Sequence, residues 1–392
     1  MEVNQIYQLL NSVTKEVLGN TDLVKEDLTG LVDLGKEVFN QNAVDNYVKS
    51  LVNHIGKVVF VNRPYSGKIP SVLMDAWEFG SVLEKISADI PEAEENKSWE
   101  LTDGQTYSQD VFHKPVVTAK FFNSKVTFEV AVSITEQQVK ESFSNSEQLN
   151  AFYSMIYNAV EKSITIKTDA LIMRTINNMI AETLIADSAA FGAGDDVAAD
   201  YSSASTARCV NLLKLYNTQK GTALTADKAI TDPDFIKFAS YTIGLYSDRL
   251  ASISSAFNVG GKPRFTPKEN LHVVLLSDFE KAAKAYLYAD SYNKEQVLLP
   301  NAETIPFWQG SGKNYEFTNT AHINIKETNG QSVEISGVLG VMFDRDALGV
   351  CNVNRRVTTN YNAKAEFFNN YYKFDAGYFN DTNENFVVFF VA

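Results

Sequence analysis

The feature that most constrains this fold is a helical pattern over residues 144–184 that contains neither proline nor glycine. Ser144 and Glu147 form a capping-box signal at its start. The apolar residues that keep mostly to one face are Leu149, Phe152, Ile156, Val160, Ile164, Leu171, Ile176, Met179 and Ile180. A helix of this length measures about 60 Å, which is longer than most single domains are wide. The sequence therefore predicts an elongated subunit built along one long helix.

The amino-terminal segment, residues 1 to about 55, has the spacing of several short amphipathic helices. In the first of them, Ile6, Leu9, Val13 and Val17 recur at intervals of three or four residues. Helices this short are marginal in isolation and need a surface to pack against. We expect this segment to be an arm that lies on another surface.

An acidic stretch precedes the long helix. Residues 84–110 carry eight carboxylates and two lysines, a net charge of −6, and contain the turn signal Asp103-Gly104. Strand-like sequences flank this stretch at residues 82–90 and 114–122. The pattern predicts two extended arms joined by a polar tip, a long hairpin. The residues leave an ordinary surface loop open as the alternative.

The carboxyl-terminal half alternates strand and helix signals. A strand is predicted at 126–134, and the Ala-, Gly- and Asp-rich stretch 188–205 is a domain boundary. Helices are predicted near 206–219 and 233–256, and a buried strand at 271–277 runs directly into a helix. This alternation indicates a second domain of α/β or α+β type.

From residue 337 to the end, the chain is rich in β-branched and aromatic residues. The aromatic residues between 367 and 374 are expected in a core or an interface. The final residues 386–392 (FVVFFVA) would aggregate if they were unpaired. We expect them to form a strand in a sheet, inside the subunit or between subunits.

Composition limits the function. The 392 residues are 45% hydrophobic and carry a net charge of −13, so a large core and two or three folding units are expected. No basic run is present, which argues against a dedicated nucleic-acid reader and leaves weak contact with DNA. No signal peptide or membrane span is indicated. Cys209 and Cys351 stand far apart, so no disulfide framework is implied and a reducing cytoplasm suits the chain.

We find no pattern typical of catalysis, of a cofactor site or of a metal site. None of the four histidines lies within four residues of another histidine or a cysteine, and His272 fits a satisfied core position. The sequence 310–313 (GSGK) lacks the earlier glycine and the following Ser or Thr of a phosphate loop. Residues 344–346 (DRD) are typical of a turn or a salt-bridged interface. We therefore expect no enzymatic activity.

The order of these parts resembles the Hong Kong 97-type fold of tailed-phage major capsid proteins. Similar stretches are Phe121-Phe122-Asn123, 134–152, 307–312, 340–350 and the end of the chain from Tyr371. The resemblance implies an α+β fold with an amino-terminal arm, an E-loop, a peripheral domain with a spine helix, and an axial domain. The implied boundaries are 1–57 for the arm, 58–118 for the strand and E-loop, 119–188 for the peripheral domain, 189–336 for the axial domain, and 337–392 for a β-rich return to the axial and peripheral domains.

The resemblance also implies a function. The chain would assemble into hexamers and pentamers of an icosahedral shell that encloses double-stranded phage DNA, in the virion and after assembly in the host bacterial cytoplasm. Implied partners are further copies of itself, a separate scaffolding protein, a portal protein at one vertex and weakly bound DNA, with decoration proteins allowed and no membrane. The acidic hairpin would need basic partners on neighbouring copies. The candidate inter-subunit contacts are Glu92, Glu94, Glu95, Trp99, Lys120, Arg355 and Arg356.

Two alternatives stay open. The first is an encapsulin-type shell, which has the same fold and encloses a cargo enzyme. The second is a hydrolase that uses carboxylates distant in sequence, and it would require a discrete oligomer with a concave pocket. About 55 residues precede the first strand, and for this reason we also expect no proteolytic removal of a long amino-terminal segment.

Overall fold

The computed structural model describes residues 3–18, 46, 69–74, 83–91, 93, 95–96, 98–107, 110, 112–135, 146–191, 201–290, 302–309, 323–326 and 332–392. The chain divides into two compact units, each made of segments distant in sequence. Unit 1 comprises Met1–Glu78, Ser124–Ile172 and Val350–Gly377, and unit 2 comprises Phe79–Asn123, Met173–Gly349 and Tyr378–Ala392. The division therefore falls within the long helix and within two long strands.

Unit 1 is built around a four-stranded sheet with the order β1-β11-β12-β4. Strand β12 runs antiparallel to β4, and Phe374 of β12 lies opposite Phe128 of β4 with 4.9 Å between the ring centroids. The strand predicted at 126–134 is thus confirmed, and Phe368, Tyr372 and Phe374 are buried as core residues. The strands are β1 (Leu73–Met74), β4 (Lys125–Thr135), β11 (Leu348–Asn362) and β12 (Phe367–Asn380).

The long helix is confirmed as α5, Ser146–Ala186. Its buried side chains include Ile156, Val160 and Ile164 in unit 1, and the apolar face continues to Leu184 in unit 2. The first predicted short helix is α1, Val3–Leu18, with Leu10 and Val13 buried. The later short helices expected up to residue 55 lie outside the described residues, apart from Asn46.

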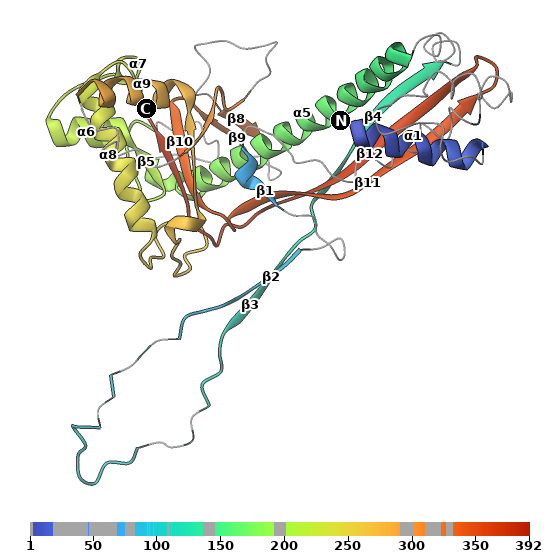
Figure 1. The fold of residues 1–392 in the computed structure, drawn as a ribbon. Helices are drawn as coiled ribbons and strands as arrows, with labels where there is room; N and C mark the ends of the chain where they lie inside the picture. Colours follow the sequence, from blue (N-terminus) through green and yellow to red (C-terminus); the bar gives the residue numbers. More distant parts are fainter. Residues whose placement is uncertain are drawn as a thin grey trace. The chain divides into compact units, whose positions relative to one another are not determined.

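Unit 2 contains a five-stranded mixed sheet with the order β5-β13-β10-β6-β7 (Figure 1). The chain's last strand, β13, pairs antiparallel with β10 and parallel with β5, and all its residues are buried. The apolar carboxyl end is therefore paired inside the subunit. The strands are β5 (Cys209–Asn211), β6 (Leu271–Leu276), β7 (Glu303–Ile305), β10 (Val338–Asp344) and β13 (Phe386–Phe390).

Helices cover this sheet and complete its core. Phe235 and Ile243 of α8 and Phe279 of α9 belong to one buried cluster with Val387 and Phe389 of β13. The helices of unit 2 are α6 (Leu212–Lys220), α7 (Ala226–Ala229), α8 (Pro233–Leu250) and α9 (Ser277–Asp290), with the short 3₁₀ helices η2 (Ser188–Phe191) and η3 (Lys268–Asn270); η1 (Pro70–Val72) belongs to unit 1.

Two sequence expectations for this region need correction. The residues Cys209–Asn211, predicted as helical, form β5, because they pair with β13, a strand more than 170 residues away. The Asn211 side chain then accepts from the Lys214 N–H and caps α6. Helix α8 ends at Leu250 instead of 256, because Ser254 pairs with Arg264 in an isolated β-bridge.

Two smaller two-stranded ribbons also belong to unit 2. One consists of β8 (Ile323–Lys326) and β9 (Ser332–Ile335). The other consists of β2 (Leu83–Ala88) and β3 (Val117–Phe122), which run antiparallel and confirm the two predicted arms (Figure 1). Asp103-Gly104 forms a turn between them, with Gly104 at φ 83°.

Candidate assembly interface

The β2–β3 ribbon has two chemically different faces. Residues that lie directly opposite in an antiparallel pair project to the same face of the ribbon. One face carries the pairs Leu83–Phe122, Lys85–Lys120 and Ser87–Thr118. The other face carries the pairs Glu84–Phe121, Ile86–Ala119 and Ala88–Val117. The first face carries both lysines, and the second is apolar apart from Glu84.

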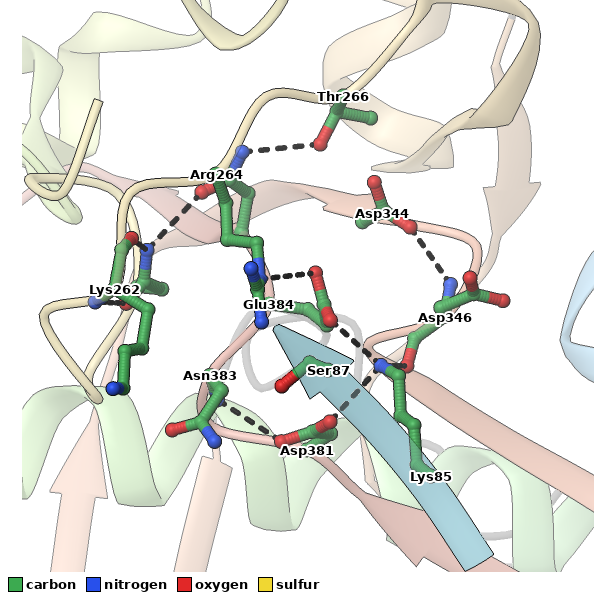
Figure 2. A network of polar contacts seen from close by, with 12 residues as sticks. Lys85, Ser87, Lys262, Arg264, Thr266, Asp344, Asp346, Asp381, Asn383 and Glu384 are labelled. Atoms are coloured by element: carbon green, nitrogen blue, oxygen red, sulfur yellow. Dashed lines mark hydrogen bonds and ion pairs between the residues drawn. The ribbon is translucent and has the colours of Figure 1, made fainter. Parts of the chain in front are cut away.

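The cationic face is bound to the body of unit 2. Lys85 Nζ lies 2.9 Å from Asp381 Oδ2 and 2.8 Å from Glu384 Oε1, and donates to the Asp346 carbonyl at 3.1 Å (Figure 2). Lys120 Nζ lies 2.9 Å from Asp381 Oδ1. The Asp381 side chain is 3% exposed, so both lysines meet a nearly buried carboxylate. We call these contacts the hairpin root.

The turn that carries Asp381 and Glu384 is itself braced by the loop after α8. The Asn383 N–H donates to Asp381 Oδ1, and the Gly260 N–H donates to the Thr382 carbonyl. Arg264 Nε lies 3.6 Å from Glu384 Oε2 (Figure 2). A Cβ on Gly260 would lie 2.1 Å from Asn383 Oδ1, so a larger residue at this position would displace the Asn383 side chain. The root therefore presents its carboxylates from a fixed backbone.

A second contact lies where β2 ends. Lys262 Nζ is 2.8 Å from Asp89 Oδ2, and both side chains are about one-third exposed. The backbone of Lys262 is held by Asn258, whose side chain accepts from the Lys262 N–H and donates to its carbonyl. The Lys262–Asp89 ion pair therefore holds the end of β2 against the loop after α8.

The ionisation of the root follows from these contacts. Burial alone would raise the pKa of Asp381, but the hydrogen bonds and charges of Lys120 and Lys85 outweigh burial and lower it. Burial likewise lowers the pKa of Lys85, but Glu384 and Asp381 outweigh it, and the pKa of Lys85 is raised. Both groups are therefore held in their charged forms at neutral pH.

The rest of the hairpin is exposed. Every described residue from Ile90 to Ala119 is exposed, and so are Ile86 and Phe121 on the outward face. Trp99 is 96% exposed and Phe112 84% exposed. Soluble chains rarely leave so many large apolar side chains in water unless another surface covers them. The outward face of the ribbon, which carries Ile86 and Phe121, and the tip, residues 90–116, together have the chemistry of an interaction surface.

The structure separates the seven contact residues expected from the sequence. Glu95 and Trp99 lie exposed on the hairpin, whereas Glu92 and Glu94 lie outside the described residues. Lys120 binds Asp381 of its own chain. Arg356 forms an ion pair with Asp375 on the neighbouring strand β12 of the same chain, and Arg355 is half-buried beside a cavity in unit 1. Contacts of these residues with a neighbouring copy stay predictions.

Sequence reasoning missed most of the root. The composition identifies Lys85 only as a base within an acidic stretch, and no sequence pattern points to Asp381 or Glu384. Lys85 and Asp381 stand almost 300 residues apart, and no spacing rule connects them. Pairing of the two strands in this register places Lys85 opposite Lys120. Two ammonium groups at such a position repel each other, which predicts a carboxylate between them.

The described residues hold neither a metal-binding cluster nor a membrane-spanning helix. In that part of the chain, no group of three or more His, Cys, Asp or Glu side chains is arranged to hold a metal ion. None of the helices it contains is long and apolar enough to cross a membrane. His272 is half-buried in β6 beside Phe343, and its Nε2 has no hydrogen-bond partner, so the satisfied core position expected from the sequence is wrong for this atom. Residues 310–313 lie outside the described residues.

Solved structures of phage particles contain chains similar to this one. One is the capsid structure of Staphylococcus phage Andhra, with TM-score 0.50, 8% identity, and coverage of 85% of this chain and 86% of that chain. Another is the structure of the head fiber and inner core protein gp22 of native bacteriophage P68, with TM-score 0.49, 7% identity and coverage of 85% and 86%. The first supports a mixed α+β fold of the kind found in a phage capsid. No curated protein matches the chain.

The family comparison covers nearly the whole sequence. The family model described as Phi29-like phage major capsid protein matches residues 10–390. This range includes most of both units and the whole of the β2–β3 hairpin with its root. Proteins of this kind are structural and form a shell, which agrees with an exposed apolar hairpin. The chain belongs to the family of Phi29-like phage major capsid proteins.

Proposed function

We propose that this capsid protein assembles into hexamers and pentamers of an icosahedral shell around double-stranded DNA, and that the β2–β3 hairpin holds neighbouring copies together. The observation that carries the proposal is the division of the ribbon into two faces. The lysine face is bound within the subunit, and the apolar face with the tip is left in solvent. A ribbon anchored on one side and apolar on the other is suited to lie between two copies.

The Hong Kong 97-type fold is part of this proposal. In it, the hairpin is the E-loop, α5 is the spine helix of the peripheral domain, and the five-stranded sheet with α6, α8 and α9 is the axial domain. The long uninterrupted α5 and the separate β-rich core of unit 2 support this assignment. The boundaries 57, 118, 188 and 336 are proposed on the same basis.

The proposed partners follow from the chemistry of a closed shell. A portal protein would occupy one vertex, and a separate scaffolding protein would guide curvature during assembly in the bacterial cytoplasm. The net charge of −13 opposes tight binding of packaged DNA, so we propose weak and salt-sensitive contact. The family match favours this phage shell over a cargo compartment and over a hydrolase.

Substitution of the outward face tests the role of the hairpin. Ile86 and Phe121 are 64% and 63% exposed in the single chain, so Ile86→Ser with Phe121→Ser leaves folding intact. Burial of each side chain at an interface contributes about 1.5–3 kcal/mol. We expect the double variant to need at least about tenfold more protein to assemble, measured by light scattering and sedimentation.

The matched control changes the opposite face of the same ribbon. Ser87→Ala removes the hydroxyl that pairs with Thr118 at 3.1 Å and leaves the apolar face unaltered. This variant is expected to assemble like the wild type. Equal assembly of the Ile86→Ser/Phe121→Ser variant and the wild type would refute the proposed role of the hairpin.

A further inference from the structure

A cavity of about 540 Å³ lies within unit 1, between α5 and the sheet. Its apolar walls include Met74 of β1, Ile164 of α5 and Phe374 of β12. Ile166 of α5 also lines it and is 65% exposed, so the cavity reaches solvent along that helix. The volume falls in the range of about 300–1,000 Å³ that is typical of small-molecule pockets, so the cavity has room for a single aromatic side chain.

The border of the cavity carries a net positive charge of one. Lys162 and Arg355 line it, together with a single carboxylate, Glu161. Lys162 is exposed and forms no ion pair within the described residues. Burial lowers the pKa of Arg355, which the charge of Glu161 partly offsets, so this guanidinium is already partly removed from water. An apolar group with negative charges beside it would complement this border.

The hairpin tip has that composition. Trp99 has the highest exposure among the large apolar side chains of the described chain, at 96%. The carboxylates Glu95, Glu100 and Asp103 lie close to it in sequence, and all three are exposed. Tryptophan is enriched among the residues that dominate binding energy at interfaces, because it buries a large area with few rotatable bonds. A shell made of many copies supplies such a tip for every cavity.

We propose that Trp99 of one copy inserts its indole into the cavity of a neighbouring copy. Arg355 then lies against the aromatic ring, and Lys162 pairs with the carboxylates beside Trp99. The inference rests on the proposed role of the hairpin and adds the occupied site. Arg355, Trp99 and Glu95 then all take part in the same contact between two copies.

A crosslink between two separately labelled copies tests this contact. One preparation carries Ser98→Cys, which keeps Trp99, and the other carries Ile166→Cys at the cavity mouth. Both chains carry Cys351→Ala, because Cys351 lines the cavity and would compete for the crosslink. Cys209 is retained, because it is buried. Mixed particles treated with diamide are expected to give a reducible covalent dimer, which must join two different chains.

Matched variants make the test specific. Adding Trp99→Ala to the Ser98→Cys chain should lower the dimer yield about tenfold, as for other anchor residues. Adding Ser87→Ala instead, a change on the inward face of the same ribbon, should leave the yield unchanged. A third mixture pairs Ser98→Cys with Ile253→Cys, which is 60% exposed in unit 2, and should give no dimer.

The possible failures are distinguishable. Closed shells that give no Ile166 crosslink, or that crosslink at Ile253 instead, would overturn the cavity contact and leave the proposed function standing. Equal yields with Trp99→Ala and Ser87→Ala would assign the cavity to another occupant and overturn the inference in the same way. Failure of the parent chain to form any shell would count against the proposed function itself.

Discussion

At the residue scale, Asp381 is the central group of the hairpin root. It receives Lys85 and Lys120 from the two strands of the ribbon, and the backbone N–H of Asn383 from its own turn. Removal of one partner from a buried ion pair costs about 3–5 kcal/mol in general. Because the Lys120 side chain is 38% exposed, solvent screens part of this contact, and a smaller cost applies here.

We therefore predict that Asp381→Asn lowers the free energy of unfolding of the unassembled chain by about 2 kcal/mol. Urea denaturation followed by circular dichroism measures this change. The control is Asp248→Asn, which breaks an ion pair with Lys268 whose side chains are 63% and 69% exposed. The control should cost less than about 0.5 kcal/mol. Equal losses in the two variants would contradict the account of the root.

The lowered pKa of Asp381 also predicts a dependence on pH. A carboxyl whose pKa is lower in the folded state stabilises the fold above its unfolded value, here 3.8, and loses this effect as pH falls through the folded pKa. The difference in unfolding free energy between the wild type and Asp381→Asn should be constant from pH 5 to 7, and should shrink below pH 4. A difference in unfolding free energy that grows as pH falls would contradict a lowered pKa of Asp381.

At the element scale, the last strand is fixed by a close backbone contact. Strand β13 is followed by Val391, whose N–H donates to the Gly337 carbonyl at 2.9 Å. Gly337 has φ 81°, and a Cβ there would lie 2.0 Å from the Val391 carbonyl oxygen. Glycine is required at this position for both reasons, because other residues adopt this φ at a cost and none fits the space.

Gly337→Ala is accordingly predicted to destabilise unit 2 by at least about 2 kcal/mol. The control is Gly261→Ala, which has φ 63° but no atom within 4 Å of the added Cβ. The control carries only the backbone strain, about 1 kcal/mol. Thermal unfolding of both variants measures the difference, and a Gly261→Ala variant as unstable as Gly337→Ala would argue against the close contact.

The elements that could be predicted from the sequence are those specified by local patterns. The periodicity of α5 and the alternation along β4 are contained within single segments, and both elements form as expected. The apolar run 271–276 likewise forms β6. Strand β5 could not be predicted, because three residues carry no periodicity and become a strand only by pairing with β13. The end of α8 depends similarly on the Ser254–Arg264 bridge.

The candidate interface likewise has one part that could be predicted from the sequence and one part that could not. Its exposed part, the acidic hairpin with Glu95 and Trp99, is one continuous segment and could be identified from composition. Its anchored part joins Lys85 and Lys120 to Asp381 and Glu384, which meet only in the folded unit. Charge alone could not reveal that Lys120 is engaged within its own chain.

At the scale of the whole molecule, the two units share the work of assembly in this account. Unit 2 anchors the hairpin through the root and presents its apolar face and tip. Unit 1 offers the cavity beside α5 as the receiving site on another copy. Donor and receiver are different surfaces of one chain, and heterologous contacts of this kind generate rings where the rotation between copies closes, as the proposed hexamers and pentamers require.

Electron microscopy of the purified chain, alone and with a candidate scaffolding protein, tests the central claim most directly. The account predicts closed shells built of five- and six-membered rings, with density for residues 83–122 lying on a neighbouring copy. A protein that stays monomeric under both conditions, across salt and concentration, would contradict the shell-forming account. Shells in which residues 83–122 contact only their own chain would contradict the role given to the hairpin.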